Sequence, residues 1–229
     1  MIQTAEIKIR ETDAVCDPLG ALFLPHSATL IVSDLHLEKG AAFARRGMLL
    51  PPYDTAQTLK LVTAVINRYQ PACVICLGDS FHDRQGAAAL PSDQQEQIAN
   101  LMARRHWFWI AGNHDPDEPK GLGGDCVSEL YLEGLCFRHE PASDRETSVG
   151  EVSGHLHPAA RVVRRGKGVR RPCFATDGIR MIMPSFGVTT GGLNLRNAAF
   201  AGLFDPRRLT AHLLGRERIY SVAFDRLIG

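Results

Sequence analysis

The 229-residue sequence predicts an α/β fold in which two packed, mixed β-sheets are flanked by helices. Apolar runs of strand length at residues 28–33, 72–77 and 106–111 alternate with two segments of helical spacing, residues 53–69 and 92–104. This alternation is typical of βαβ units with parallel strands. Later in the chain, short strand candidates separated by Gly, Pro and Asp-Gly dominate, which predicts a second sheet.

The boundaries of these elements follow from local signals. Residues 5–10 and 21–24 are expected to be short strands on either side of a turn at residues 17–20. Pro71 ends the first helical segment, and Ser92 with Gln95 forms a candidate capping box at the start of the second. The later strand candidates are residues 126–132, 134–139, 149–154, 160–165, 172–175, 179–183, 209–213 and 217–222. We expect one domain over residues 1–229, with no internal repeats.

Composition is that of an ordinary soluble protein, with 45% hydrophobic and 22% charged residues. A net charge of +1 neither requires nor excludes a nucleic-acid partner, because a local basic patch can act within a neutral total. No segment resembles a signal peptide or a transmembrane helix, so we expect a cytoplasmic protein without membrane partners. The oligomeric state is left open.

The six cysteines are expected to be reduced thiols. Cys73 and Cys76 form a C-x-x-C motif, but they fall within a predicted buried strand. Residues three apart on a strand point to opposite faces, so these two thiols are not expected to share a zinc ion.

Polar residues that suit metal binding directly follow several predicted strands. In chain order they are Asp34, His36, Asp79, Asn113, His114, Asp115, His139, His155 and His157. Ligands of α/β sheets bind at the carboxyl ends of the strands, so we expect these side chains to meet in one crevice. Imidazole nitrogens with carboxylate and amide oxygens, without thiolates, favour divalent metals of intermediate softness. His-x-His can supply one ring to each of two metals, and the carboxylate of Asp79 can bridge them.

The ordered set D-x-H, G-D, G-N-H-D, a lone H and G-H-x-H, over residues 28–160, resembles the calcineurin-like metallophosphoesterase superfamily. The resemblance implies a four-layer αββα sandwich that holds two divalent metal ions. One ion would be bound by Asp34, His36, Asp79 and His157, and the second by Asp79, Asn113, His139 and His155. His114 would contact the scissile phosphate as a catalytic residue, and a metal-bridging hydroxide would attack the phosphodiester.

Within that superfamily, the stretches S-D-L-H-L-E-K-G and G-D-S-F-H-D resemble the ligase-associated DNA damage response endonucleases, the PdeM group. Residues 184–187 and 190–194 are also similar to that group. The resemblance implies a DNA endonuclease or phosphodiesterase of DNA repair that uses Mn²⁺, with Fe or Zn as alternatives, and DNA ligase or helicase partners. The spacing after Asp79 differs from the pattern of protein phosphatases.

Several assignments stay open. His82, Asp115, Arg45 and Arg46 are candidates for supporting the metal ligands or contacting substrate. The basic stretch of residues 161–171 is either a solvated hairpin, turning at residues 166–168, or a contact for a phosphate backbone. The aromatic run of residues 107–109 is expected to be core. Two further hypotheses for function are a phosphodiesterase or pyrophosphatase acting on nucleotides or lipid-linked diphosphates, and a non-catalytic scaffold with the same fold.

Overall fold

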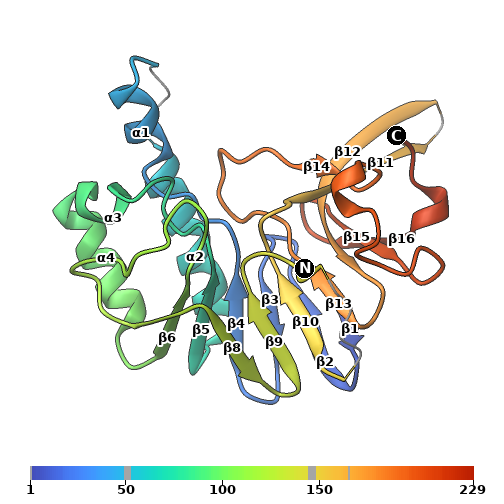
Figure 1. Ribbon diagram of the computed structural model, residues 1–229, viewed down its shortest axis with the longest axis horizontal. Coiled ribbons are helices and arrows are strands. Elements are labelled where there is room, and N and C mark those ends of the chain that lie inside the picture. The colour runs from blue at the N-terminus through green and yellow to red at the C-terminus, as the bar shows by residue number, and fades with distance from the viewer. Residues whose placement is uncertain (1, 49–52, 144–147, 165) are drawn as a thin grey trace.

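In the computed structural model, which describes residues 2–48, 53–143, 148–164 and 166–229, the chain forms two β-sheets packed together (Figure 1). The first sheet has its strands in chain order: β1 (Ala5–Ile9), β2 (Thr12–Cys16), β3 (Leu22–Leu24), β4 (Thr29–Val32), β5 (Cys73–Leu77), β6 (His106–Ile110) and β7 (Asp125–Val127). The pairs from β1 to β4 are antiparallel, and those from β4 to β7 are parallel. The sheet is therefore mixed, as the sequence predicted.

The second sheet is also mixed. Its strands are β8 (Glu129–Leu132), β9 (Leu135–Arg138), β10 (Gly150–Ser153), β11 (Pro158–Arg164), β12 (Lys167–Thr176), β13 (Arg180–Ile182), β14 (Leu193–Asn194), β15 (Thr210–Leu214) and β16 (Ile219–Ala223). Strand β10 runs parallel to both β9 and β13, and the long hairpin of β11 and β12 is antiparallel. The parallel strands of both sheets point their carboxyl ends toward the same side of the molecule (Figure 1).

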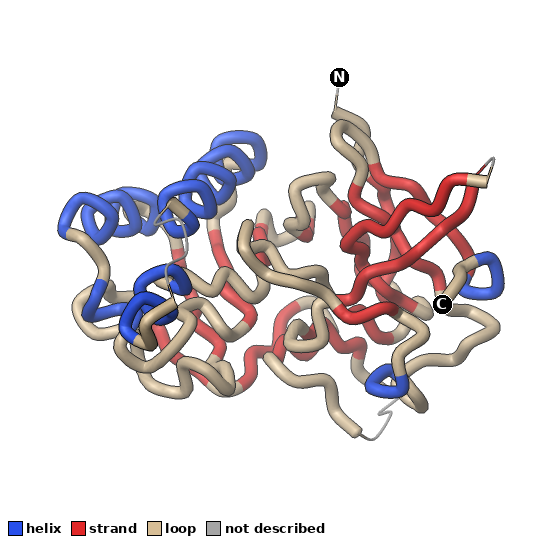
Figure 2. The backbone as a smooth tube through the Cα atoms, turned by 90° about the horizontal axis from the view of Figure 1, so that it is seen from above, coloured by secondary structure: helices blue, strands red, loops and turns tan. Residues whose placement is uncertain are grey.

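Helices cover the outer face of the first sheet (Figure 2). They are α2 (Asp54–Tyr69), α3 (Gly86–Ala89) and α4 (Ser92–Met102). The apolar stripe of α2, including Leu59, Val62 and Ile66, packs on a core cluster shared with strand residues such as Val74. A further short helix, α1 (Lys39–Arg45), projects away from the sheets (Figure 1).

A second core cluster fills the space between the sheets, with Ile31 and Ile75 from the first sheet facing Phe137 and Phe174 from the second. The outer face of the second sheet carries a third cluster. Two short 3-10 helices cover it, η1 (Ala198–Phe200) and η2 (Phe224–Arg226), together with loops. The prediction of two packed mixed sheets flanked by helices is confirmed, and the outermost layer on this side consists of 3-10 turns.

Residues 126–132, predicted as one strand, are two strands in different sheets. Strand β7 completes the first sheet, and after Ser128 strand β8 begins the second. Both halves of the segment are strands, so both carry the apolar pattern of a strand. That pattern alone does not show where the chain passes from one sheet to the other. Strand β6 leads to β7 through a loop, without an intervening helix.

Other boundaries differ in instructive ways. Pro91, not Ser92, is the N-cap of α4, and the Gln95 side chain donates to the carbonyl of Leu90 instead of closing a capping box. Strand β2, strand β14 and helix α1 were not predicted. Lys167 already belongs to β12, so the basic hairpin does not turn at residues 166–168 as predicted, and Arg165 of that stretch lies outside the described residues.

The aromatic run of β6 belongs to the core, as predicted. Trp107 and Trp109 are buried toward the helices, and Phe108 packs toward the other sheet. Cys73 and Cys76 likewise lie on opposite faces of β5. In the described part of the chain, no helix is long and apolar enough to cross a membrane.

Stability is expected to depend on pH through His212, which is buried on β15 with its Nδ1 2.8 Å from Ser221 Oγ. Burial lowers the pKa of His212 to about 4, below its ordinary value of about 6.5. Between pH values of about 4 and about 6.5, His212 is protonated in the unfolded chain and neutral in the folded chain. The free energy of unfolding should therefore fall by roughly 2–3 kcal/mol from this residue as pH drops from about 6.5 to about 4.

Urea unfolding across this pH range, for the protein and for His212→Asn, would measure the effect. Other groups also titrate, so the quantity of interest is the difference between the two pH profiles. Parallel profiles would contradict the assignment.

Candidate metal centre

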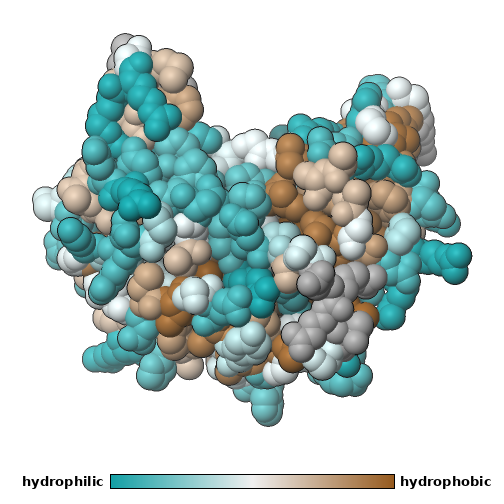
Figure 3. All heavy atoms as spheres, viewed as in Figure 1, coloured by the Kyte–Doolittle hydropathy of each residue, from teal (hydrophilic) through white to brown (hydrophobic). Residues whose placement is uncertain are grey.

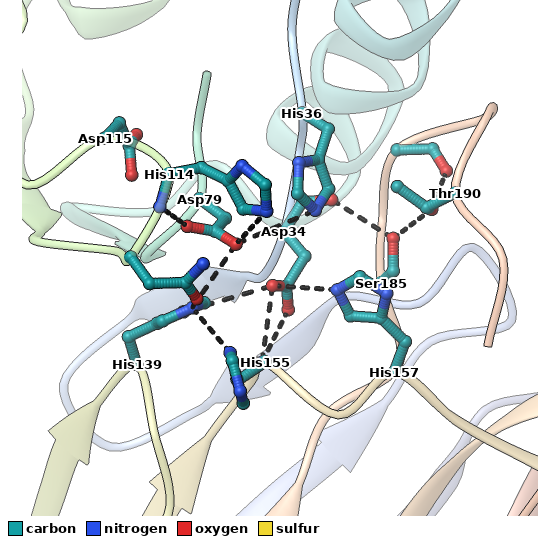
Figure 4. Close-up of polar contacts among 12 residues, drawn as sticks. Asp34, His36, Asp79, His114, Asp115, His139, His155, His157, Ser185 and Thr190 are labelled. Atoms are coloured by element: carbon teal, nitrogen blue, oxygen red, sulfur yellow. Dashed lines mark hydrogen bonds and ion pairs between the residues drawn. The ribbon is translucent and has the colours of Figure 1, made fainter. Parts of the chain in front are cut away.

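The candidate ligands lie where the carboxyl ends of strands from both sheets meet. Asp34 and His36 follow β4, Asp79 follows β5, and Asn113 follows β6 of the first sheet. His139 follows β9, and His155 and His157 follow β10, in the second sheet. Figure 4 shows the aspartate and histidine side chains turned toward one another, and Asn113 Oδ1 lies 3.0 Å from His139 Nε2. The structure thus brings all seven predicted ligands together, and their role as ligands stays a prediction.

The backbone at these positions is strained in a repeated way. Five of the predicted ligands have positive φ angles, which residues with a Cβ rarely adopt. They are Asp34 (53°), His36 (44°), Asp79 (46°), His155 (66°) and His157 (44°). Such conformations cost of the order of 1–3 kcal/mol each and persist only where the surrounding structure imposes them. Here they turn the chain sharply at each strand end and direct the side chains inward.

Neighbouring loops hold this conformation. The backbone N–H groups of Asp34 and His36 donate to the carbonyls of Gly78 and Asp79, at 3.2 and 2.9 Å. The loop after β5 is held in turn, because the N–H of His82 donates to the carbonyl of Leu37 at 2.9 Å. The Asp-x-His and Gly-Asp loops therefore form one hydrogen-bonded unit.

The glycines before three ligands act in two ways. Gly78, before Asp79, has a φ of 76°, which allows a sharp turn into the site. Gly112 and Gly154 do not have a positive φ, so they do not provide a turn of this kind. They are needed for space: a Cβ at Gly112 would overlap the backbone nitrogen of Asp79, and one at Gly154 would overlap the hydroxyl of Ser33.

One group of candidate ligand atoms comes from Asp34, His36 and His157, all within 4.8 Å of one another. His157 Nε2 lies 3.0 Å from Asp34 Oδ1 without hydrogen-bond geometry, and its Nδ1 lies 3.2 Å from the carbonyl of Gly191. The carbonyl can accept the Nδ1 proton, which fixes the orientation of the ring and leaves Nε2 as the candidate ligand atom beside Asp34. His36 Nε2 is 3.9 Å from Asp79 Oδ2, which places Asp79 beside this group.

The second group consists of Asp79, His139 and His155, again within 4.8 Å of one another. His139 Nε2 lies 3.4 Å from Asp79 Oδ2, 3.3 Å from His155 Nδ1 and 3.0 Å from Asn113 Oδ1. Its Nδ1 lies 3.1 Å from the carbonyl of Leu77, which fixes the orientation of the ring. His139, the least specific motif in the sequence, is thus among the best-anchored residues of the site.

This donor set fits divalent cations. Three acceptor atoms face His139 Nε2, namely Asp79 Oδ2, Asn113 Oδ1 and His155 Nδ1. A single proton on Nε2 can form a good hydrogen bond with only one of them. A cation among the four atoms would accept a lone pair from each. Asp34 and Asp79 are 0% and 2% exposed, so their negative charges also need compensation inside the protein.

Electrostatics within the site point the same way. Burial raises the pKa of Asp79, but the hydrogen bond and charge of His139 outweigh it and lower the pKa to about 2. Burial lowers the pKa of His139, whereas Asp79 and Asp34 outweigh burial and raise the pKa to about 9. Without metal, a proton on His139 therefore supplies the positive charge that the carboxylates require.

His114 belongs to neither group and is more exposed than the Asp and His ligands. Its backbone N–H donates to Asp79 Oδ1 at 2.9 Å, and its ring stands beside His36 with the ring centres 5.3 Å apart. His82 stacks on the His114 ring, with the ring centres 5.3 Å apart and an interplanar angle of 19°. The His82 ring also lies 5.6 Å from that of His36 and against Phe43 of α1. Its contact with the predicted ligand His36 fits support of a metal ligand, one of the two roles left open by the sequence.

The other candidate polar residues fall outside the ligand groups. Asp115 Oδ2 accepts from the N–H of Phe81 at 3.0 Å, so Asp115 supports the loop that carries Asp79. Arg45 pairs with Asp83 at 2.5 Å, which occupies its guanidinium, and Arg46 is exposed at the end of α1. Neither arginine lines the cavity beside the candidate ligands.

A cavity of about 430 Å³ opens beside the candidate metal ligands. Its walls include His36, His114, His155 and His157, and also Lys39 and the loop of residues 190–193. That loop is tied to the site, because Ser185 Oγ donates to the carbonyl of Asp34 at 3.1 Å and contacts Thr190 Oγ1. Residues 190–194 and Lys39 entered the sequence prediction only within stretches that carry a resemblance, without a role, because a single lysine in a motif carries little signal.

The basic stretch forms the far part of the β11–β12 hairpin, which stands on the opposite side of the site from α1 (Figure 1). The guanidinium of Arg170 donates to the carbonyl of Gly192, which lines the cavity. Arg161 Nη1 donates to the carbonyl of Gly229 at 3.3 Å. The hairpin is therefore solvated along much of its length, with one arginine fixed beside the cavity loop.

Comparison with known proteins places this geometry in a family. Residues 28–182 match the model of the calcineurin-like phosphoesterases. The nuclease MPE of Pseudomonas putida has a similar structure, with a TM-score of 0.72 and 26% identity over 96% of this chain and 100% of that one. The phosphoesterase Yfce of E. coli gives a TM-score of 0.45 and 16% identity, over 86% and 98% of the two chains. No curated protein matches the sequence. Because the matched segment spans well over half of its length, the chain belongs to the calcineurin-like phosphoesterase family.

Proposed function

We propose that this protein is a binuclear, Mn²⁺-dependent DNA phosphodiesterase or endonuclease that acts in DNA repair. The observation that carries the proposal is the meeting of two ligand groups, one around Asp34 and one around His139, with Asp79 reaching both. The likeness to the Pseudomonas putida nuclease, over almost the whole of both chains, supports a nuclease over other phosphoesterases. DNA ligase or helicase partners are proposed from the sequence resemblance alone.

Metal ions held by these groups would activate water and bind the oxygens of a phosphodiester. The residues of the chain have separate tasks around that chemistry. Asp34 and Asp79 supply the negative charge, and the carbonyls of Leu77 and Gly191 hold the rings of His139 and His157 in place. His114 stands at the cavity wall without belonging to a ligand group. Its ring can donate a proton or hydrogen bond to a phosphate oxygen, which suits stabilisation of the leaving group.

The surroundings suit a long, anionic substrate. Figure 3 shows a hollow between two raised parts of the surface, which correspond to α1 and the β11–β12 hairpin in Figure 1. The cavity beside the candidate ligands is lined by Lys39 of α1 and by the loop of residues 190–193, to which Arg170 of the hairpin is bound. A polymer such as DNA can pass between the two projections, whereas a closed pocket would be expected for a small nucleotide.

DNA cleavage is the direct test. The purified protein with Mn²⁺ should cut single-stranded, nicked or duplex DNA, and a chelator should abolish cutting. Hydrolysis of a small diester or of a nucleotide, without cleavage of any DNA, would reject the nuclease proposal and favour the small-molecule alternative. Absence of bound metal and of any turnover would instead favour the scaffold hypothesis.

Substitutions should separate the bridging residue from its neighbours. Asp79→Asn removes the charge that both groups share and is expected to lower kcat/KM by about 100-fold or more. His82→Ala removes the ring contacts with His36 and His114 but no predicted ligand, and is expected to cost about tenfold. Asp117→Asn is a matched control, because this carboxylate is exposed and pairs with Arg84 away from the ligands. Similar losses for Asp79→Asn and His82→Ala would show that Asp79 does not bridge.

Metal binding should release protons. Because the pKa of His139 is raised to about 9 without metal, this ring carries a proton at neutral pH that metal must displace. We expect roughly one proton released per two Mn²⁺ at pH 7, and an affinity that increases with pH up to about 9. Calorimetric titration in buffers of different ionisation enthalpy measures this release, and His139→Asn should reduce it.

A further inference from the structure

One cation faces the cavity without a part in either ligand group. Lys39, the first residue of α1, lines the cavity together with His36, His82 and His114. Its Nζ donates to the carbonyl of Thr189 at 3.1 Å, so the side chain reaches from α1 across to the loop that also holds His157. The ammonium group has three N–H donors, and this contact uses one.

The backbone on both sides of Lys39 is held firmly. The N–H of Glu38 donates to Thr55 Oγ1 at 2.8 Å, and the N–H of Gly40 donates to Asp54 Oδ2 at 2.9 Å. Glu38, Asp54 and Thr55 are all buried, and the last two begin α2. The base of α1 is thus fixed to a helix of the core, which places the lysine stem before any substrate arrives.

The charge of Lys39 differs from that of the basic residues around it. Arg45 and Arg84 pair with Asp83 and Asp117, so their charges are largely offset. Among the described residues, Lys39 takes part in no ion pair. Two divalent cations would offset the negative charges of Asp34 and Asp79, and their remaining positive charge would attract the reacting phosphate. The buried carboxylate of Asp54, which accepts the N–H of Gly40, acts on the Lys39 ammonium electrostatically but forms no ion pair with it. The remaining N–H donors of Lys39 are therefore open to a second anionic group.

We propose that Lys39 binds a second phosphate of the substrate, next to the phosphate that is hydrolysed. The site would then select chains with at least two phosphates in series over isolated diesters. This inference rests on the proposed function, because a nucleic acid provides a phosphate at every nucleotide. Lysine is suited to such a contact as a compact point charge that tolerates several phosphate orientations.

Short substrates that differ by one phosphate test the proposal. The dinucleotides TpT, pTpT and TpTp would be used as inhibitors of the Mn²⁺-dependent hydrolysis of bis(p-nitrophenyl) phosphate, and their own cleavage would be followed in the same reactions. For the unmodified protein, whichever of pTpT and TpTp is the stronger inhibitor should inhibit about tenfold more strongly than TpT. In Lys39→Met that ratio should fall to about one, and Lys39→Arg should keep most of it.

Lys60→Met is the matched control, because Lys60 is exposed on α2 and outside the cavity. It removes the same charge and should leave the ratio unchanged. If the unmodified protein shows no preference for the added phosphate, or if Lys39→Met keeps the preference, the proposal for Lys39 is overturned. Cleavage of the dinucleotides or of longer DNA reports separately on the proposed nuclease function, so the two failures are distinguishable.

Discussion

The burial of two carboxylates, Asp34 and Asp79, is the constraint on which the rest of the site depends. Both lie at the junction of the two sheets with almost no exposure to water. Buried negative charge is unstable unless hydrogen bonds and positive charge compensate it. Asp34 receives the N–H of His155 at 3.1 Å and the hydroxyl of Ser33, and Asp79 receives the N–H of His114. The remaining demand for positive charge explains why the neighbouring histidines converge there.

The same constraint explains the unusual backbone. Several ligand positions adopt positive φ angles, and a Cβ at Gly78, Gly112 or Gly154 would strike a residue of the site. This strain is maintained because rigid neighbours enclose it: parallel strands lie beneath each loop, and the loops bond to one another. In the calcineurin-like phosphoesterase family, which uses divalent metals, such rigidity holds ligands in place before the ion binds.

The site also depends on an unusual crossing of the chain. Neither sheet alone contains a complete group of ligands, because His139, His155 and His157 come from the second sheet, and Asp34 and Asp79 from the first. The crossing between β7 and β8 allows both sets of parallel strands to present their carboxyl ends at one place. Substrate selection then falls to elements that rise beyond the sheets, namely α1 with Lys39 and the hairpin that carries Arg170.

The sequence by itself determined the class of fold and the identity of the candidate ligands. Alternating apolar runs predict strands and helices, and motifs such as Gly-Asn-His-Asp follow strand ends, because both signals are local along the chain. Only the tertiary structure decided which sheet each later strand joins, that Arg45 is occupied by Asp83, and that Lys39 faces the cavity. It also decided that Gly112 and Gly154 are needed for space, not for a turn. These features depend on contacts between residues far apart in the sequence, which no local pattern records.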